Sequence, residues 1–238
     1  MTYEEKRINV WNLIWNERGK NFPEDDPIKI DGFDQDFGRL TQDNIDTIII
    51  DIRDKLQLTK QDVLYEFGCG AGMLLSRLVP FVKYCCGTDL SNEMIHRSKK
   101  LFSNIKVQQA DSTKLPFDNE KFDKILVHSV FQYFQDTTYT EKVMDELLRV
   151  TKSGAMILIL DLMNQEKKDE YIELRKKYVT STQNFWKSSI KNKCEHLYFS
   201  KEFFEDFSKK RNMKCKIEDR HIQGYINSQF RFDVLLTK

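Results

Sequence analysis

Residues 63–72, VLYEFGCGAG, join an apolar run to one acid and three glycines at alternate positions. A glycine-rich turn between a strand and a helix lets a ligand approach the backbone without meeting a Cβ, and it exposes unpaired amides where the helix begins. Gly68, Gly70 and Gly72 form that pattern, and Glu66 is costly to bury unless a partner binds it. A carboxylate here would repel a pyrophosphate, so the pattern favours a ligand with positive charge and no phosphate.

The glycine spacing differs from the dinucleotide-binding fingerprint G-x-G-x-x-G, because Met73 stands where that pattern requires glycine. Together with Glu66, this difference disfavours a nucleotide-dependent oxidoreductase. A turn that merely connects a strand to a helix is the simpler alternative, and further acids downstream weigh against it.

Two of these acids follow apolar runs at the intervals expected of a strand–helix–strand repeat. Asp89 lies about twenty residues after the glycines, and Asp111 precedes Ser112. A carboxylate can accept hydrogen bonds from two vicinal hydroxyls, and open α/β sheets bind ligands at the carboxyl ends of their strands. Each acid could instead cap local structure, Asp89 at the helix that begins near Ser91 and Asp111 at a turn.

A parallel sheet would bring these residues together, and the middle of the chain predicts one. Short apolar runs alternate with stretches of helical spacing. We expect strands at 62–68, 82–89, 105–111, 122–129 and 155–162, and helices at 72–81, 91–102 and 138–150. Ser91 should cap the second helix, and Thr138 with Glu141 should form a capping box on the third. The fold class is therefore α/β, a doubly wound and mostly parallel sheet.

Both ends of the chain depart from this alternation. Before the core we expect a helix over 1–20, a loop over 20–40 and a helix over 41–56. After it we expect a charged helix over 164–178, an irregular aromatic stretch, a helix over 200–212 and two strands over 214–222 and 230–238. We predict one domain over 1–238, with an N-terminal helical cover (1–58), a ligand-binding core (59–163) and a lid with the final strands (164–238).

Composition narrows the possible partners. The 238 residues carry 38 basic and 37 acidic side chains, and a net charge of +1 gives no overall field to attract nucleic acid or an anionic membrane. No stretch reaches the roughly 20 apolar residues of a membrane span, and the N-terminus lacks the apolar region of a signal peptide. We therefore expect a cytoplasmic protein with no nucleic-acid or membrane partner. Its oligomeric state is open.

The cysteines form an odd set without Cys-x-x-Cys spacing, which argues against a disulfide framework and a zinc site. They are Cys69, Cys85, Cys86, Cys194 and Cys215. We expect reduced, buried thiols, with the adjacent Cys85 and Cys86 pointing to opposite faces of a strand. No metal site is predicted.

The glycine segment resembles the first motif of the class I S-adenosylmethionine-dependent methyltransferases, acidic-x-Gly-x-Gly-x-Gly, which is complete from Glu66 to Gly72. The resemblance continues in GTDLS around Asp89, in QQADSTKLPF around Asp111, and in the later segments FDKILVHSVFQYF and LLRVTKSGAMILILDL. It covers roughly residues 60–163. It implies a Rossmann-like sheet of seven strands with the last antiparallel.

The resemblance also implies S-adenosylmethionine as cofactor, with Asp89 at the ribose hydroxyls and Asp111 at the adenine amino group. The residues expected at the cofactor are Glu66, Gly68, Cys69, Gly70, Gly72, Asp89, Leu90, Met94, Asp111, Ser112 and His128.

Methyl transfer from a sulfonium requires an acceptor held in line, exclusion of water, and removal of a proton where the acceptor is a hydroxyl. The candidate bases are His128, at the end of the fourth expected strand, and His221, at the end of the sixth, with Asp161 and Tyr133 as competitors. A histidine at a strand end is equally compatible with a structural role.

The expected acceptor is a small polar molecule, and more specifically a hydroxyl of a sugar or similar metabolite, held between the N-terminal cover and residues 180–199. The cover offers Trp11, Trp15, Asp34, Asp36 and Phe37, and the other segment offers Gln183, Asn184, Phe185, Trp186, Lys187, His196 and Tyr198. Helical spacing also allows Trp11 and Trp15 to serve in packing alone. The alternatives are N- or C-methylation of another small molecule, or a non-catalytic S-adenosylmethionine-binding module. A nucleic-acid methyltransferase is disfavoured, since HSVFQYF stands where an Asn/Asp-Pro-Pro-Tyr/Phe segment would lie.

Overall fold

A mixed sheet organises the computed structural model, which describes residues 3–33, 38–178 and 195–238. The described strands are β1 (Val63–Phe67), β2 (Tyr84–Asp89), β3 (Lys106–Gln109), β4 (Phe122–His128), β5 (Thr151–Met163), β6 (Lys214–Asp219) and β7 (Arg231–Thr237). They form one sheet in the order β3-β2-β1-β4-β5-β7-β6. Strands β1 to β5 pair in parallel, and β7 is antiparallel to both β5 and β6. The predicted mostly parallel sheet with an antiparallel last strand is confirmed.

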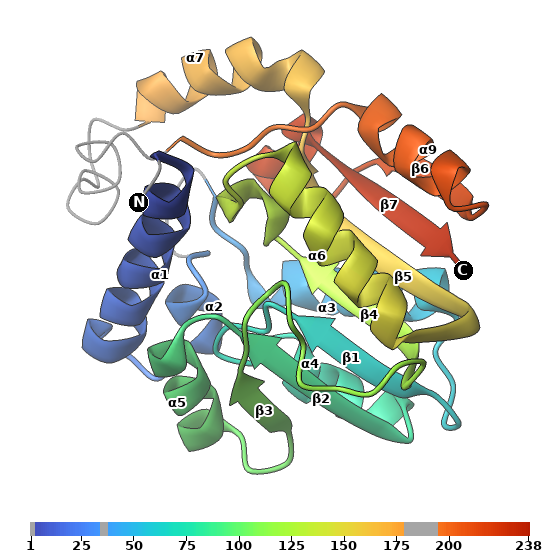
Figure 1. Ribbon diagram of the computed structural model, residues 1–238. Helices are drawn as coiled ribbons and strands as arrows, with labels where there is room; N and C mark the ends of the chain where they lie inside the picture. The colour runs from blue at the N-terminus through green and yellow to red at the C-terminus, as the bar shows by residue number, and fades with distance from the viewer. Residues whose placement is uncertain (1–2, 34–37, 179–194) are drawn as a thin grey trace.

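Helices cover both faces of this sheet. They are α1 (Tyr3–Asn21), α2 (Pro27–Ile30), α3 (Gln42–Leu56), α4 (Leu75–Leu78), α5 (Asn92–Leu101), α6 (Thr137–Val150), α7 (Lys168–Tyr178) and α9 (Lys201–Lys210). Short 3-10 turns are η1 (Val79–Phe81), η2 (Phe131–Tyr133), η3 (Gln165–Lys167) and η4 (Ile226–Phe230). Figure 1 shows α6 and α9 in front of the sheet, α3 and α4 behind it, and α1 standing beside α5.

The sheet divides the apolar core into two layers. One layer contains the buried face of α3, including Ile48, together with α4 and one side of the strands. The other contains the aromatic face of α9, including Phe204, together with α6 and the opposite side of the strands. Cys85 belongs to the first layer and Cys86 to the second, as alternation along a strand predicts. The four described cysteines are free, and Cys194 lies outside the described residues.

Helix boundaries agree with the sequence in some places and differ in others. The Ser91 hydroxyl accepts from the Met94 amide at 3.2 Å, which confirms the predicted cap of α5. The predicted capping box on α6 is wrong, because Asp136 is the N-cap and accepts from the Tyr139 amide at 2.7 Å. The helix expected over 72–81 is short and ends in a 3-10 turn, since Pro80 lacks the amide that would continue it.

The segment expected as a loop over 20–40 contains helix α2. Asp26 caps it by accepting from the Ile28 amide at 3.0 Å, and Pro27 takes the first helical position, where a missing amide costs little. The guanidinium of Arg18 in α1 donates to the Ile30 carbonyl at 2.8 Å. These contacts fix α2 against α1, at the edge of the sheet where the candidate site lies.

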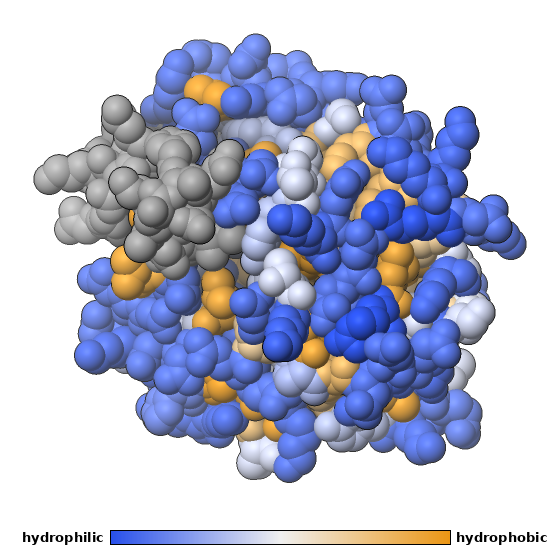
Figure 2. Space-filling model, in the orientation of Figure 1, coloured by the Kyte–Doolittle hydropathy of each residue, from blue (hydrophilic) through white to orange (hydrophobic). Residues whose placement is uncertain are grey.

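On the face seen in Figure 2, hydrophilic residues predominate and apolar ones are scattered. The large apolar side chains most exposed among the described residues are Leu13, Ile50 and Tyr84. Single exposed apolar residues of this kind are ordinary on a folded surface. In the described part of the chain, no helix is both long and apolar enough to cross a membrane.

Candidate functional site

A cavity lies at the carboxyl ends of β1, β2 and β4, around the point where the strand order reverses. This is the position at which open α/β sheets bind ligands. The glycine turn after β1 forms its floor, α1 and the end of α2 cover it, and η2 contributes a further wall. Three segments far apart in the sequence therefore enclose one space.

The turn after β1 is built from glycines in the left-handed region and is tied to β2. Gly68 has φ +70° and Gly70 has φ +52°, a region in which side chains are strained. The Gly70 amide donates to Asp89 Oδ2 at 3.0 Å, and the Ser91 amide donates to Asp89 Oδ1 at 2.8 Å. Each carboxylate oxygen has a second acceptor position, so Asp89 can cap this turn and still bind a ligand hydroxyl.

Glu66 is the most deeply placed acid of the site. Its side chain lies on buried β1, the residue is 3% exposed, and Oε2 has no hydrogen-bond partner among the described residues. Burial raises its pKa well above the ordinary value, and the negative charges of Asp31 and Asp89 add to the effect. Such a carboxyl group is stabilised when a hydrogen-bond donor or a positive charge reaches it.

Asp31 is a site residue that the sequence interpretation missed. It ends α2 and lines the cavity, and its Oδ1 accepts from the Ala71 amide at 2.7 Å. Burial raises the pKa of Asp31 to about 7, the Ala71 hydrogen bond opposes that rise, and the charge of Asp89 adds to it. The sequence predicts a loop at this position, and nothing in the sequence pairs its acid with a turn 40 residues further along the chain.

The acids of the cavity lack basic neighbours on its wall. Asp31, Glu66 and Asp89 all line it, and burial raises the pKa of Asp89 as well. Among the described lining residues there is no lysine or arginine. The cavity is thus suited to a ligand that brings its own positive charge.

Most of the residues expected at a cofactor lie on this cavity. Its lining includes Glu66, Gly68, Cys69, Gly70, Asp89, Leu90, Met94, Ser112 and His128. Gly72 and Asp111 lie outside that lining. A Cβ on Gly72 would come within 2.7 Å of Ser98 Oγ and 2.8 Å of Ile105 Cδ1, so this glycine allows close packing beneath the turn. Asp111 is exposed and accepts from the Thr113 amide at 2.7 Å, which is the local turn that the sequence left as its alternative.

The two candidate histidines are separated in the structure. His128 ends β4, is 8% exposed and lines the cavity. Burial lowers its pKa to about 4, and the charge of Arg220 contributes, so the ring is neutral at neutral pH. His221 is exposed and outside the cavity lining, because β6 ends at Asp219 and the chain turns Arg220 inward instead. The structure therefore does not support His221 as a base.

Aromatic side chains form a further part of the cavity wall. Trp11 and Trp15 of α1 and Tyr133 of η2 line the cavity, with Tyr133 ring centroids 4.8 Å from Trp11 and 5.4 Å from Trp15. His196 stacks on Trp11 at 5.2 Å. Tyr198 lies instead beside Tyr171, with centroids 6.4 Å apart.

Part of the predicted acceptor region lies outside the described residues. This concerns Asp34, Asp36, Phe37, Gln183, Asn184, Phe185, Trp186 and Lys187. The described part of the chain contains no group of three or more His, Cys, Asp and Glu side chains placed to hold a metal ion.

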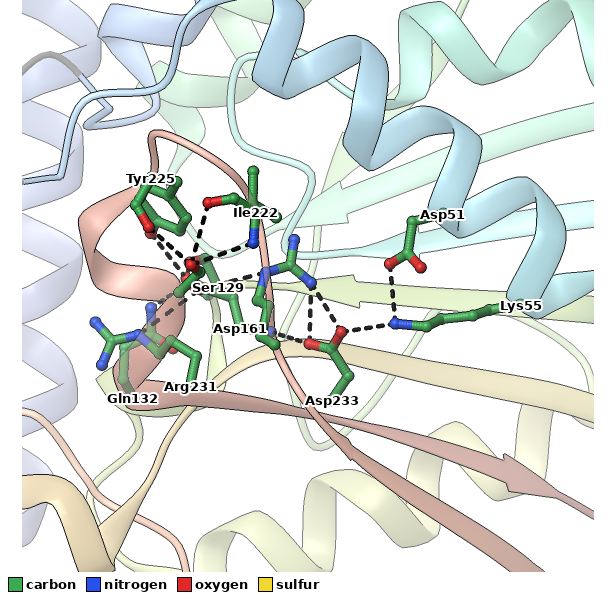
Figure 3. A network of polar contacts seen from close by, with 11 residues as sticks. Asp51, Lys55, Ser129, Gln132, Asp161, Ile222, Tyr225, Arg231 and Asp233 are labelled. Atoms are coloured by element: carbon green, nitrogen blue, oxygen red, sulfur yellow. Dashed lines mark hydrogen bonds and ion pairs between the residues drawn. The ribbon is translucent and has the colours of Figure 1, made fainter.

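Behind the cavity, β4 and β5 end in a polar network (Figure 3). Ser129, which lines the cavity, donates its hydroxyl hydrogen to Asp161 Oδ2, and the Tyr225 hydroxyl donates to the same oxygen at 3.4 Å. Ser129 has φ +58° and Asp161 has φ +64°, and the pairing of β5 with β7 shifts register around Asp161. A positive φ at a non-glycine residue costs free energy, and here two such residues lie at the ends of neighbouring strands. Backbone strain of this type is concentrated at functional sites in proteins.

Cationic side chains lie on the far side of that network. Arg220 binds Asp233 through contacts of 2.9 and 3.0 Å, and Lys55 reaches Asp233 at 2.8 Å. Burial alone would raise the pKa of Asp233, but the charges of Arg220 and Lys55 lower it. The Nε atoms of Arg220 and Arg231 lie 3.8 and 3.7 Å from Asp161 Oδ1, so two guanidinium groups offset the charge of Asp161.

Residues 65–159 match the protein family described as Methyltransferase domain. We refer to this matched segment, residues 65–159, as the methyltransferase domain. Two similar curated proteins are chondramide synthase cmdD of Chondromyces crocatus and the uncharacterized methyltransferase YcgJ of Bacillus subtilis. The first is 34% identical over 111 residues, which are 44% of this chain and 3% of that protein. The second is 30% identical over 101 residues, which are 40% of this chain and 39% of that protein. The chain thus spans well under half the length of these relatives.

Solved structures show the same architecture beyond the methyltransferase domain. The YcgJ structure has a TM-score of 0.58 at 14% identity and covers 83% of this chain and 97% of its own. Phosphoethanolamine N-methyltransferase 1 of Haemonchus contortus, solved with phosphoethanolamine and S-adenosylhomocysteine, has a TM-score of 0.69 at 13% identity and covers 100% of this chain and 50% of its own. The fold is that of the class I methyltransferases.

The methyltransferase domain supplies only part of the cavity and its support. It contains Glu66, the glycine turn, Asp89 and His128. Trp11, Trp15 and Asp31 come from the segment before it, and Arg220 and Arg231 come from the segment after it. The site therefore combines the strand ends of the methyltransferase domain with a wall from the N-terminal segment and a supporting polar network from the C-terminal segment.

Proposed function

We propose that this protein is an S-adenosylmethionine-dependent methyltransferase that acts on a small polar acceptor. The observation that carries the proposal is the set of three carboxylates around the glycine turn, in a cavity whose described lining has no lysine or arginine. S-adenosylmethionine brings an ammonium and a sulfonium group and no phosphate, which matches this charge pattern.

The residues of the methyltransferase domain fit this cofactor. Asp89 would accept from the ribose hydroxyls, since each of its oxygens keeps an acceptor position. The bare backbone at Gly68 and Gly70 would admit the methionine part, and Leu90, Met94 and Ser112 would surround the adenine. When bound, the cofactor supplies a methyl group activated for transfer.

The acceptor side combines rings with hydrogen-bonding groups. Trp11 and Tyr133 offer faces on which a small ring can stack, and Asn12, His128 and Ser129 offer polar atoms. We therefore propose O-methylation of a sugar or similar metabolite. His128 is the proposed base, because its neutral ring can accept the proton that a hydroxyl loses on methylation. The protonated ether that forms when a neutral hydroxyl accepts a methyl group is a strong acid, so a weakly basic imidazole suffices to take up its proton.

N-methylation of a small amine is the second candidate. The aromatic wall of Trp11, Trp15 and Tyr133 favours it, because aromatic rings attract ammonium groups. The solved phosphoethanolamine N-methyltransferase is one structurally similar protein with that kind of acceptor. C-methylation also occurs among similar sequences, as in the sterol 4-C-methyltransferase strm-1 of Caenorhabditis elegans, 24% identical over 139 residues.

The experiment is a calorimetric titration with S-adenosylhomocysteine, followed by a mass-shift screen of sugars, phenols and amines with S-adenosylmethionine carrying a deuterated methyl group. We expect binding, and a labelled product from the hydroxyl acceptors. Asp89→Asn is the control and should weaken binding by roughly 10-fold or more, since a charge-assisted hydrogen bond contributes about 1.5–3 kcal/mol. Absence of binding would contradict the proposal, and labelling of amines alone would select the second candidate.

A further inference from the structure

Asp31 makes a close contact with the glycine turn from outside the methyltransferase domain. Its Oδ1 accepts from the Ala71 amide at 2.7 Å, and a Cβ on Gly70 would overlap the same oxygen. The absence of a side chain at Gly70 therefore admits an acid of the protein itself to the turn. Because Asp31 also lines the cavity, this acid faces any ligand that the turn holds.

The charged groups around Asp31 are mostly negative, so a cation beside it would stabilise its carboxylate. Glu66 and Asp89 face it from β1 and β2, and the Cys69 thiol lies in the same turn. Arg18 of α1 is the positive group that acts on Asp31, and its guanidinium donates to the carbonyls of Ile30 and Lys29. The charge of Arg18 lowers the pKa of Asp31 less than burial raises it. An additional positive group beside Asp31 would be favourable.

The geometry points to Asp31 as the residue that binds the ammonium group of the cofactor's methionine part, an inference that rests on the proposed function. Of the cofactor's two positive groups, only the ammonium has N–H donors, and a carboxylate has about four acceptor positions. The Ala71 amide and, in addition, the Met73 amide act on Asp31, which still leaves acceptor positions, so Asp31 can hold the turn and the ammonium together. The N-terminal cover would thereby take part in cofactor binding as well as enclose the cavity.

Binding of two thioether ligands can distinguish ammonium binding by Asp31 from a purely structural role of this residue. S-adenosylhomocysteine carries the ammonium, whereas 5′-methylthioadenosine lacks the whole amino-acid part, and neither has a sulfonium. Asp31→Asn keeps an oxygen that can accept from Ala71 and removes the negative charge. In calorimetric titrations of the full chain, we expect this variant to bind S-adenosylhomocysteine about 10- to 100-fold more weakly, with 5′-methylthioadenosine affinity unchanged.

Two control variants accompany the affinity measurements on Asp31→Asn. Asp89→Asn should weaken binding of both thioethers, because both contain the ribose. Asp26→Asn should weaken neither, because Asp26 caps α2 away from the cavity lining and asparagine is an equally good cap. Thermal unfolding of each variant checks that it is folded.

The outcomes are distinct. An equal loss of affinity for both thioethers in Asp31→Asn would assign Asp31 to holding the turn and overturn the inference, and so would unchanged affinity for both. If the unsubstituted chain bound neither thioether, the proposed function would fail, and the ammonium role with it. A loss confined to S-adenosylhomocysteine supports the inference.

Discussion

Asp31 should make the stability of the unliganded protein fall as pH rises. Its pKa is raised from 3.8 to about 7, so between these values the folded chain holds a proton that the unfolded chain has released. Stability from this group is therefore fully present below about pH 4 and is lost as pH passes through 7. We expect the free energy of unfolding of Asp31→Asn, relative to the unsubstituted chain, to increase between pH 5 and 8. Urea unfolding at four pH values measures it, and a constant difference would contradict the assigned pKa.

His128 should make the stability of the protein rise with pH, opposite to the effect of Asp31. Its pKa is lowered from 6.5 to about 4, so between these values the unfolded chain binds a proton that the folded chain does not. Stability from this group is present above pH 6.5 and is lost toward pH 4, by up to about 3 kcal/mol at ~1.4 kcal/mol per pKa unit. His128→Asn should lose less stability than the unsubstituted chain on acidification over this range. Equal losses in the two proteins would place the imidazole in a more solvated position.

At the scale of the elements, we expect the glycines of the turn to differ in role, one needed for packing and another for ligand binding. Gly72 has φ +87° and its missing Cβ faces Ser98 and Ile105, so Gly72→Ala should destabilise the fold by about 1–3 kcal/mol. Gly70→Ala should instead displace Asp31 and reduce affinity for S-adenosylhomocysteine. Paired measurements of unfolding and of ligand affinity test both variants. A loss of affinity in folded Gly72→Ala protein with no loss of stability would reverse the assignment.

The strands could be predicted, and so could the position at the cavity of most residues expected to bind a cofactor, because their signals are local. Apolar runs mark β1, β2 and β4, and the residue at the end of each run, Gly68, Asp89 or His128, lies at the carboxyl end of its strand by necessity. Asp111 also follows a strand, β3, and is expected at the cavity for that reason. Its carboxylate instead accepts a hydrogen bond within its own turn, which its position after a strand does not predict.

Long-range contacts account for what the sequence did not predict. Asp31 meets Ala71 across 40 positions through the docking of α2, and no periodicity encodes that meeting. The side chain of Arg220, and not that of His221, points inward because it pairs with Asp233 and Asp161. These two acids are neighbours because β7 pairs with β5. Such residues become recognisable only when the order of the strands is known.

For the whole molecule, the division of the core by the sheet predicts independent layers. Ile48 of α3 and Phe204 of α9 belong to two different apolar clusters, so Ile48→Val and Phe204→Leu change different layers of the core. Their effects on the free energy of unfolding should add to within about 0.5 kcal/mol. Phe199→Leu with Phe204→Leu is the matched pair within one layer, where the rings lie 5.5 Å apart and should couple more strongly. Strong coupling across the sheet would show that the layers are not separate.

The position of β7 has a consequence for synthesis of the chain. β6 precedes β7 along the chain, but it joins the sheet only through β7, which lies between β6 and β5. Until residues 231–237 leave the ribosome, the edge of β5 is unpaired and β6 has no strand to pair with. A nascent chain that already contains the whole methyltransferase domain would therefore carry an open sheet edge, which makes it a candidate for chaperone binding and for aggregation when translation stalls late.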